Sequence, residues 1–109
     1  MSFQERRRAE RYRVNVDALW ENSTRRQRRG TISDISTSGC FLLTAPEVKV
    51  NESVKVGIQF PGGKAVTLSG QAVYAVEEIG FALRFTDLGE QERRFLHRLI
   101  NSARKNLAQ

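Results

Sequence analysis

The sequence has little of what disulfides, metal sites and membrane spans require. Its 109 residues include one cysteine, Cys40, and one histidine, His97. One thiol cannot close an intramolecular disulfide, and one thiol with one imidazole falls short of the usual ligand number of a metal site. No run approaches the roughly 18 consecutive apolar residues that cross a bilayer, and no apolar segment follows the polar, basic N-terminus. We therefore expect a cytoplasmic protein without membrane insertion.

Sequence motifs of enzymes are also missing. There is no nucleophile elbow, Walker loop, metal-binding helix or paired carboxylate motif. His97 follows Leu96 in a segment of helical periodicity, with neither a carboxylate nor a nucleophile placed beside it by the sequence. A surface or rim position is therefore expected for this imidazole. We expect no catalytic activity and no cofactor.

Length and charge limit the organisation of the chain. With 39% hydrophobic and 28% charged residues, it is long enough for one core and one domain. The net charge is +6, and residues 1–30 hold a surplus of +5 because nine arginines there face four acidic residues. Positive potential at this end attracts anions. Residues 1–12 lack apolar periodicity, so we expect a flexible basic N-terminal arm ahead of a single domain over residues 13–109.

Alternating apolar residues predict several short strands. Apolar side chains occupy every second position from Val14 to Trp20, which predicts a strand over about 13–21 with Trp20 in the core or at its rim. The β-branched segment GTISDIS predicts a second strand, joined to the first by a polar hairpin. Four more strands are predicted in CFLLT, SVKVGIQF, AVTLSGQAVYAV and GFALRF. The fold class is therefore mainly β, a six-stranded antiparallel β-barrel, with a bulge or bend near Gly70.

The end of the chain changes to a helical period. Asp87 followed by Glu90 predicts the start of a helix. Beyond that point apolar residues recur every three or four positions, and charged residues fill the positions between them. We expect one C-terminal amphipathic α-helix that packs on the barrel. Its apolar positions are Phe95, Leu96, Leu99, Ile100 and Ala103.

The predicted hairpin brings the base of the arm close to the stretch DISTSG at 34–39. If the turn lies near residues 23–27, residues whose numbers sum to about 47 lie opposite each other, so Arg13 faces Asp34. Guanidinium groups then meet a carboxylate, serine hydroxyls and a glycine that permits close approach. Guanidinium groups suit phosphate oxygens and the O6/N7 edge of guanine, and a carboxylate accepts from the N1 and N2 hydrogens of guanine. These residues predict a guanine nucleotide that is bound and not transformed.

Two motifs resemble those of the PilZ domain family. RRRAER at 6–11 is similar to the family's RxxxR motif, and DISTSG at 34–39 is similar to its [D/N]xSxxG motif. The ending IGFALRFTDLGEQERRFLHRLI also resembles the last strand and helix of the family, so the likeness covers nearly the whole chain. The RxxxR spacing recurs at Arg25/Arg29 and Arg94/Arg98, but only the first occurrence precedes a strand expected to pair beside DISTSG.

The resemblance implies a barrel of the split-barrel type that binds the bacterial second messenger cyclic di-GMP. In the family, an arginine directly before RxxxR accompanies binding of a stacked ligand dimer, and Arg6 holds that place here. The family further implies a stand-alone receptor that passes a conformational change to an effector protein, which the sequence does not identify. The other ligand-binding residues that the resemblance implies are Arg7, Arg11, Asp34, Ser36 and Gly39.

Several residues keep a second interpretation. Asp34 and Ser36 form turns on their own account, which is compatible with ligand contact. The RRQRR segment at 25–29 is expected as a solvated loop at the far end of the hairpin, with contact to an acidic partner or nucleic acid as the alternative. Tyr12 is a candidate for contact with a purine. Cys40 is expected to be a packed small residue.

Two other functions stay open at this point. A ligand-free protein interaction module would keep the same barrel, although the intact motif residues argue against it. A small basic barrel can also bind single-stranded nucleic acid through a charged groove and stacking aromatics. The nine aromatic residues fall mostly at alternating strand positions, where they should point inward. We therefore expect no nucleic acid partner.

Overall fold

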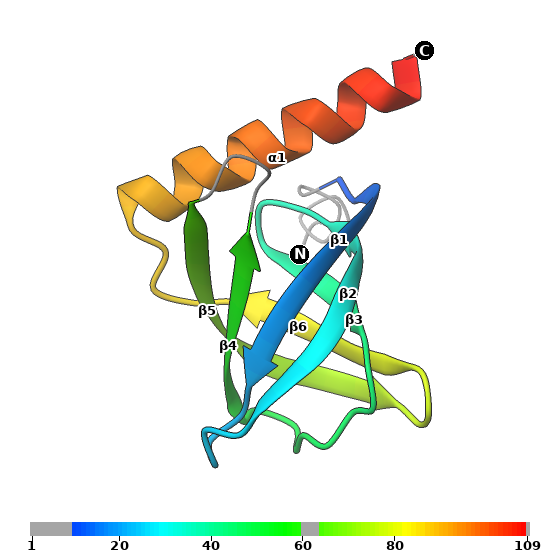
Figure 1. The fold of residues 1–109 in the computed structure, drawn as a ribbon, viewed down its shortest axis with the longest axis vertical. Helices are drawn as coiled ribbons and strands as arrows, with labels where there is room; N and C mark the ends of the chain where they lie inside the picture. Colours follow the sequence, from blue (N-terminus) through cyan, green and yellow to red (C-terminus); the bar gives the residue numbers. More distant parts are fainter. Residues whose placement is uncertain (1–9, 60–63, 109) are drawn as a thin grey trace, which may run out of the picture.

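The fold is a barrel of six antiparallel strands with one helix across its end. The computed structural model describes residues 10–59 and 64–108. Figure 1 shows α1 lying across the end of the barrel from which β1 and β5 begin, with the β1–β2 turn at the opposite end. The elements are β1 (Tyr12–Glu21), β2 (Gln27–Ile35), β3 (Gly39–Leu43), β4 (Ser53–Gln59), β5 (Ala65–Val76), β6 (Gly80–Phe85) and α1 (Glu90–Ala108).

The strand order closes the sheet on itself. Around the barrel the strands follow the order β1-β2-β3-β6-β5-β4, and β4 pairs with β1 to complete the circle. The β1–β4 ladder is short and joins Ala18–Glu21 to residues 55–58. Both expectations of fold class, the six-stranded antiparallel barrel and the C-terminal helix, are confirmed.

The first hairpin has the predicted register at the arm end. Arg13 lies opposite Asp34, as the sum of 47 requires. Beyond a register shift between Arg13 and Val16, the sum becomes 48, and Trp20 pairs with Arg28. The turn is closed by a 2.9 Å hydrogen bond from the Arg25 amide to the Asn22 carbonyl. The strand bounds differ from the prediction by one residue at the start of β1 and by three at the start of β2.

The bulge predicted at Gly70 is located elsewhere. Gly70 pairs regularly with Val54 and with Phe85, whereas the register of β5 against β6 shifts between Ala72 and Tyr74. Glycine is needed at position 70 for a different structural reason. A Cβ at this position would lie 2.5 Å from the carbonyl oxygen of Arg84, so the β6 backbone needs the space.

The core contains the alternating apolar residues, as predicted. Trp20 is 1% exposed, and its ring meets Phe81 edge-on with 4.9 Å between centroids. The Trp20 Nε1–H donates to Oγ1 of Thr44 at 3.0 Å, so the buried indole keeps a hydrogen bond. Of the two places predicted for Trp20, the core and the barrel rim, the structure shows the core.

The cap of α1 lies two residues after Asp87, the position that the sequence favoured for it. The amide of Arg93 donates to the carbonyl of Gly89, which makes Gly89 the boundary residue, while Asp87 has a positive φ of 55° in the preceding loop. The buried face of α1 contains all five predicted apolar positions. In residues 10–59 and 64–108, no helix combines the length and the apolar character that a bilayer span requires.

Candidate ligand site at the base of the arm

The first contact of the candidate site joins Arg11 to Asp34. Nε of Arg11 donates to Oδ1 of Asp34 at 2.9 Å. The two side chains are 48% and 32% exposed, so the pair is open to solvent. The bond uses Nε and one carboxylate oxygen, so the two Nη groups of Arg11 and Oδ2 of Asp34 take no part in it. The structure thus brings one residue from each of the two motifs into direct contact.

A bulge in β2 turns Asp34 outward. Between Ile32 and Asp34 the register against β3 shifts, with Ile32 opposite Leu42 and Asp34 opposite Phe41. Ser33 is the additional residue of β2 in this interval. Because of the shift, Asp34 stays on the outer face while its neighbour Ile35 is fully buried.

Ser36 builds the turn that follows β2. Its Oγ accepts the amide hydrogens of Ser38 and Gly39, both at 3.1 Å, and the Ser36 amide donates to the Gly39 carbonyl at 2.8 Å. The side chain is 0% exposed. The Ser36 hydroxyl therefore stabilises the turn between β2 and β3, as the turn-forming interpretation predicts. Contact between Ser36 and a ligand stays a prediction.

Glycine is needed at position 39 because the neighbouring strand β6 lies very close to it. A Cβ at residue 39 would overlap the carbonyl oxygen of Leu83 in β6. The sequence suggested that Gly39 permits a close approach, and in the structure it is the β6 backbone that approaches it. Beside it, Arg84 lies opposite Gly39 and donates from Nη2 to Oε1 of Gln71 at 2.8 Å.

Three outward residues beside this turn were not predicted as part of the site. Phe41 lies opposite Asp34, and its ring is 6.3 Å from that of Tyr74 across β6. Arg84 adds a guanidinium group on the same side of the barrel as Gly39. The alternation of Phe81, Leu83 and Phe85 already implied that Arg84 points outward, but the pairing of β6 with β3 was needed to place it here.

Cys40 lies buried beneath this surface. It is 0% exposed, and burial raises the pKa of its thiol to about 12, with the nearby Asp34 carboxylate raising it further and Arg11 lowering it. A thiol of this kind is neutral and unreactive at ordinary pH. The expectation of a packed small residue is confirmed.

The other arginines singled out in the sequence fall into two groups. Arg6 and Arg7 fall outside the described residues, so their ligand contacts stay predictions. Arg28, at the far end of the first hairpin, pairs with Glu47 and has its guanidinium carbon 5.7 Å from the centre of the Trp20 ring. The segment 25–29 is therefore only partly a solvated loop, because Arg28 is held against the barrel.

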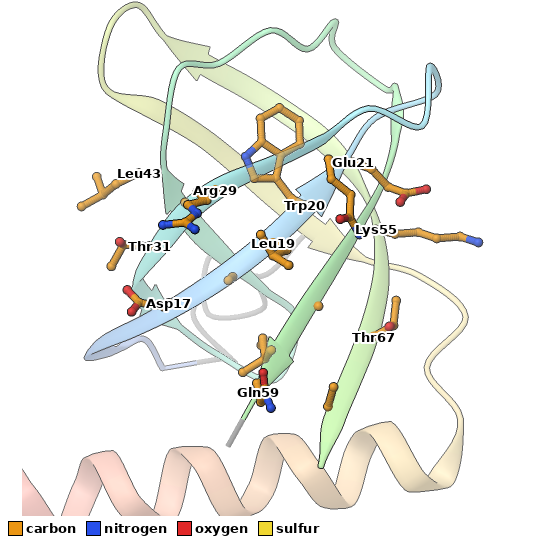
Figure 2. Close-up of a pocket in the computed structure, with 16 residues that line it drawn as sticks. Asp17, Leu19, Trp20, Glu21, Arg29, Thr31, Leu43, Lys55, Gln59 and Thr67 are labelled. Atoms are coloured by element: carbon orange, nitrogen blue, oxygen red, sulfur yellow. The ribbon is translucent and has the colours of Figure 1, made fainter. Parts of the chain in front are cut away.

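A large hollow of the described residues does not coincide with the motifs. Its volume is about 1170 Å³, and it is an open groove over β1 and its neighbours. Figure 2 shows Leu19 in the middle of β1, with Arg29 and Lys55 on opposite sides of that strand. Both charge signs are present around it, so the groove does not select an anion. The residues labelled along it are Asp17, Leu19, Trp20, Glu21, Arg29, Thr31, Leu43, Lys55, Gln59 and Thr67.

Within residues 10–59 and 64–108, no group of three or more histidine, cysteine, aspartate or glutamate side chains is placed to hold a metal ion. The candidate site is thus an exposed guanidinium–carboxylate pair beside a serine turn.

Comparison with known proteins decides the family. The PilZ domain family matches residues 5–102, which include both motifs. The chain belongs to the PilZ domain family. Its sequence matches no curated protein.

Solved PilZ structures share this fold. The PilZ domain of YcgR from Escherichia coli, solved with c-di-GMP, is similar with a TM-score of 0.78 and 17% identity over 94% of each chain. The Bacillus subtilis inhibitor of motility MotI/DgrA is similar with a TM-score of 0.76 and 15% identity, covering 93% of this chain and 52% of that one. The K. pneumonia MrkH–c-di-GMP complex gives 0.69 and 15%, covering 87% and 50%. This PilZ chain therefore spans about half the length of the last two.

Proposed function

We propose that this PilZ domain is a receptor for cyclic di-GMP. The observation that carries the proposal is the contact of Arg11 with Asp34, which joins the two motifs at one open site. Membership of the family and the presence of c-di-GMP in the related YcgR and MrkH structures support it. The site offers guanidinium donors for phosphate or guanine and a carboxylate acceptor for guanine.

The proposed signal is a change of shape without a chemical step. The arm carries Arg6 and Arg7 and continues directly into β1. Charge-assisted hydrogen bonds to the ligand offset the entropy cost of ordering the arm around it. The ordered arm and ligand then present a new surface to an effector protein, which makes the domain an adaptor. The cytoplasm is the proposed compartment.

The proposed stoichiometry depends on Arg6. This arginine directly precedes the RxxxR motif, the arrangement associated with a stacked pair of ligands. We therefore expect two cyclic di-GMP molecules per domain. A measured stoichiometry of one would remove this part of the proposal and leave the receptor function intact.

Calorimetric titration of the full chain with cyclic di-GMP tests the proposal. GTP and cyclic di-AMP are the ligand controls, because a guanine-specific site should reject the adenine analogue. An Arg7→Ala/Arg11→Ala variant should lose binding. The matched control is Arg25→Ala/Arg29→Ala, which removes the same charge at the same spacing at the other end of the hairpin and should bind normally.

Absence of heat at high ligand concentration would favour a ligand-free interaction module. That alternative has an observation of its own. The β5–β6 hairpin exposes large apolar side chains, which is unusual on the outer face of a barrel and typical of contact surfaces. They are Val73, Tyr74, Val76 and Ile79, at 44%, 52%, 38% and 52% exposure.

A further inference from the structure

A cationic hollow, separate from the groove over β1, lies between α1 and the start of β5. Its volume is about 330 Å³, and it is lined by Lys64, Val66, Gln91, Arg94, Phe95 and Arg98. In Figure 1, β5 begins beneath the N-terminal half of α1, whereas β1 begins beneath its C-terminal half. None of the lining residues belongs to the proposed cyclic di-GMP site, so the hollow is a separate feature of the fold.

The sequence of α1 directs two guanidinium groups to this hollow. Arg94 and Arg98 are four residues apart on the helix, which places their side chains one above the other on one face. Phe95 beside them is 1% exposed and packs in the core. Lys64 directly precedes β5 and reaches the hollow from the barrel side, with half-buried Val66 below it. Three cationic side chains thus surround an apolar floor.

The positive charge of the hollow is poorly neutralised. Glu90 approaches Arg94 at 3.8 Å, and the two side chains are 86% and 69% exposed. Such an exposed i,i+4 pair contributes little to stability, so Arg94 is easily redirected toward a ligand. In the part of the chain that the structure describes, Lys64 and Arg98 form no ion pair.

We propose that Lys64, Arg94 and Arg98 bind a phosphate group in this hollow. Arginine offers planar forks of donors that match two phosphate oxygens, and lysine adds a compact charge. The amide of Gln91 supplies a further neutral donor at the rim. Val66 and Phe95 form an apolar floor that offers no competing charge to these cationic groups. The third RxxxR spacing of the sequence therefore has a function of its own.

The size of the hollow defines the class of ligand. Its volume lies at the lower end of the range of about 300–1,000 Å³ for small-molecule pockets, so it holds a single phosphate group with a small substituent. A free phosphoester and the headgroup of an anionic lipid carry the same chemistry. Either one would link α1 to β5 through charge-assisted bonds and hold the helix on the barrel.

Amide chemical shifts of the full chain test this proposal, with inorganic pyrophosphate as the probe at constant ionic strength. We expect saturable shifts of the Lys64, Gln91 and Arg94 amides and a rise of Tm, because a ligand of the native state stabilises it. An Arg94→Gln/Arg98→Gln variant should lose at least tenfold in pyrophosphate affinity. Arg11→Gln should keep it, which separates this site from the cyclic di-GMP site.

The matched control is Arg25→Gln/Arg29→Gln, with equal charge loss and equal spacing. If this control weakens pyrophosphate binding equally, the loss of affinity comes from overall charge alone, and the proposal is overturned. A second arm measures sedimentation with phosphatidylglycerol vesicles against phosphatidylcholine vesicles. Binding to phosphatidylglycerol alone, lost in Arg94→Gln/Arg98→Gln, would assign the phosphate to a lipid headgroup. If pyrophosphate causes no shifts and the vesicles are not bound, the proposal is overturned.

Discussion

Arg11 and Asp34 form an ion pair of 2.9 Å although they lie 23 positions apart in the sequence. The contact exists because the first hairpin places Arg13 opposite Asp34. An exposed pair of this kind contributes about 0–1 kcal/mol to stability. Its two residues are therefore free to serve a ligand, and replacing either should leave the barrel folded.

The first prediction concerns affinity for cyclic di-GMP. Arg11→Ala should weaken binding by about 2–4 kcal/mol, because a charge-assisted hydrogen bond to phosphate or guanine is lost. Titration calorimetry measures the change, and circular dichroism should show an unchanged fold. Arg29→Ala is the matched single control. Unchanged affinity in Arg11→Ala would remove Arg11 from the ligand site.

The second prediction concerns the contact of β3 with β6. Gly39→Ala should destabilise the ligand-free domain by about 1–3 kcal/mol or more, because the new methyl group overlaps the Leu83 carbonyl. Urea denaturation measures the loss. In the control Gly57→Ala, the nearest atom to the new methyl is 3.6 Å away, an ordinary contact, so the change should be small. Equal effects in the two variants would contradict the steric account of Gly39.

The third prediction concerns the thiol of Cys40. Burial raises its pKa to about 12, so the native protein should not react with a thiol reagent at pH 8, and unfolding should expose the thiol. The unfolded thiol ionises near pH 8.5. The free energy of unfolding should therefore fall as pH rises from about 9 to 12, because only the unfolded state releases the proton.

The Cys40 contribution can be isolated with Cys40→Ala. Its urea midpoint, compared with that of the natural chain at pH 8 and pH 10.5, should fall less over this interval. Identical falls in the two proteins would show that another group causes the alkaline loss of stability.

The fourth prediction concerns the hydrogen bond under Trp20. Thr44 accepts from the indole at 3.0 Å and donates to the Arg29 carbonyl at 2.9 Å. Thr44→Val removes both bonds with little change of shape, so it should cost about 1–3 kcal/mol in unfolding free energy. Exposed Thr67 on β5 provides the control variant Thr67→Val, for which urea denaturation should give a change within about 0.5 kcal/mol.

The fifth prediction concerns acid stability at the loop before β4. The Ser23 hydroxyl donates to Oε2 of Glu52 at 2.5 Å, and the Lys49 amide donates to Oε1 at 2.8 Å. These bonds lower the pKa of Glu52, with the Ser23 hydroxyl as the largest cause. The stabilisation is present above the ordinary glutamate pKa of about 4.3 and is lost as pH falls through the lower folded-state value. Urea midpoints of Glu52→Gln and the natural chain should therefore differ at pH 7 and converge at low pH.

The sequence predicted the strands because one face of each strand is buried and the other is not. Alternation from Val14 to Trp20 requires this arrangement, and the polar turn after Glu21 sets the register of the hairpin. The bulges were harder to place. Gly70 was selected because glycine tolerates irregular backbone, yet it serves a close approach to Arg84, and the register shift comes at Val73, where composition gives no signal.

The contact of Arg11 with Asp34 could be predicted from the sequence because it depends on a local hairpin. Asp34 lies in β2 and Arg11 directly precedes β1, the strand that pairs with it, so counting from the turn is enough to bring the two residues together. Arg84 comes near Gly39 only because β3 pairs with β6, a neighbour that is distant in sequence. Local patterns say that Arg84 points outward, but only the tertiary fold determines what lies beside it.

The short β1–β4 ladder has a consequence for engineering. It closes the barrel through Ala18–Glu21, at the end of β1 that is remote from the arm. The first half of β1, which continues into the arm, pairs with β2 and has no part in that closure. We therefore expect the barrel to stay closed when the segment before Tyr12 is exchanged for another peptide, so the domain could serve as a scaffold for grafted segments.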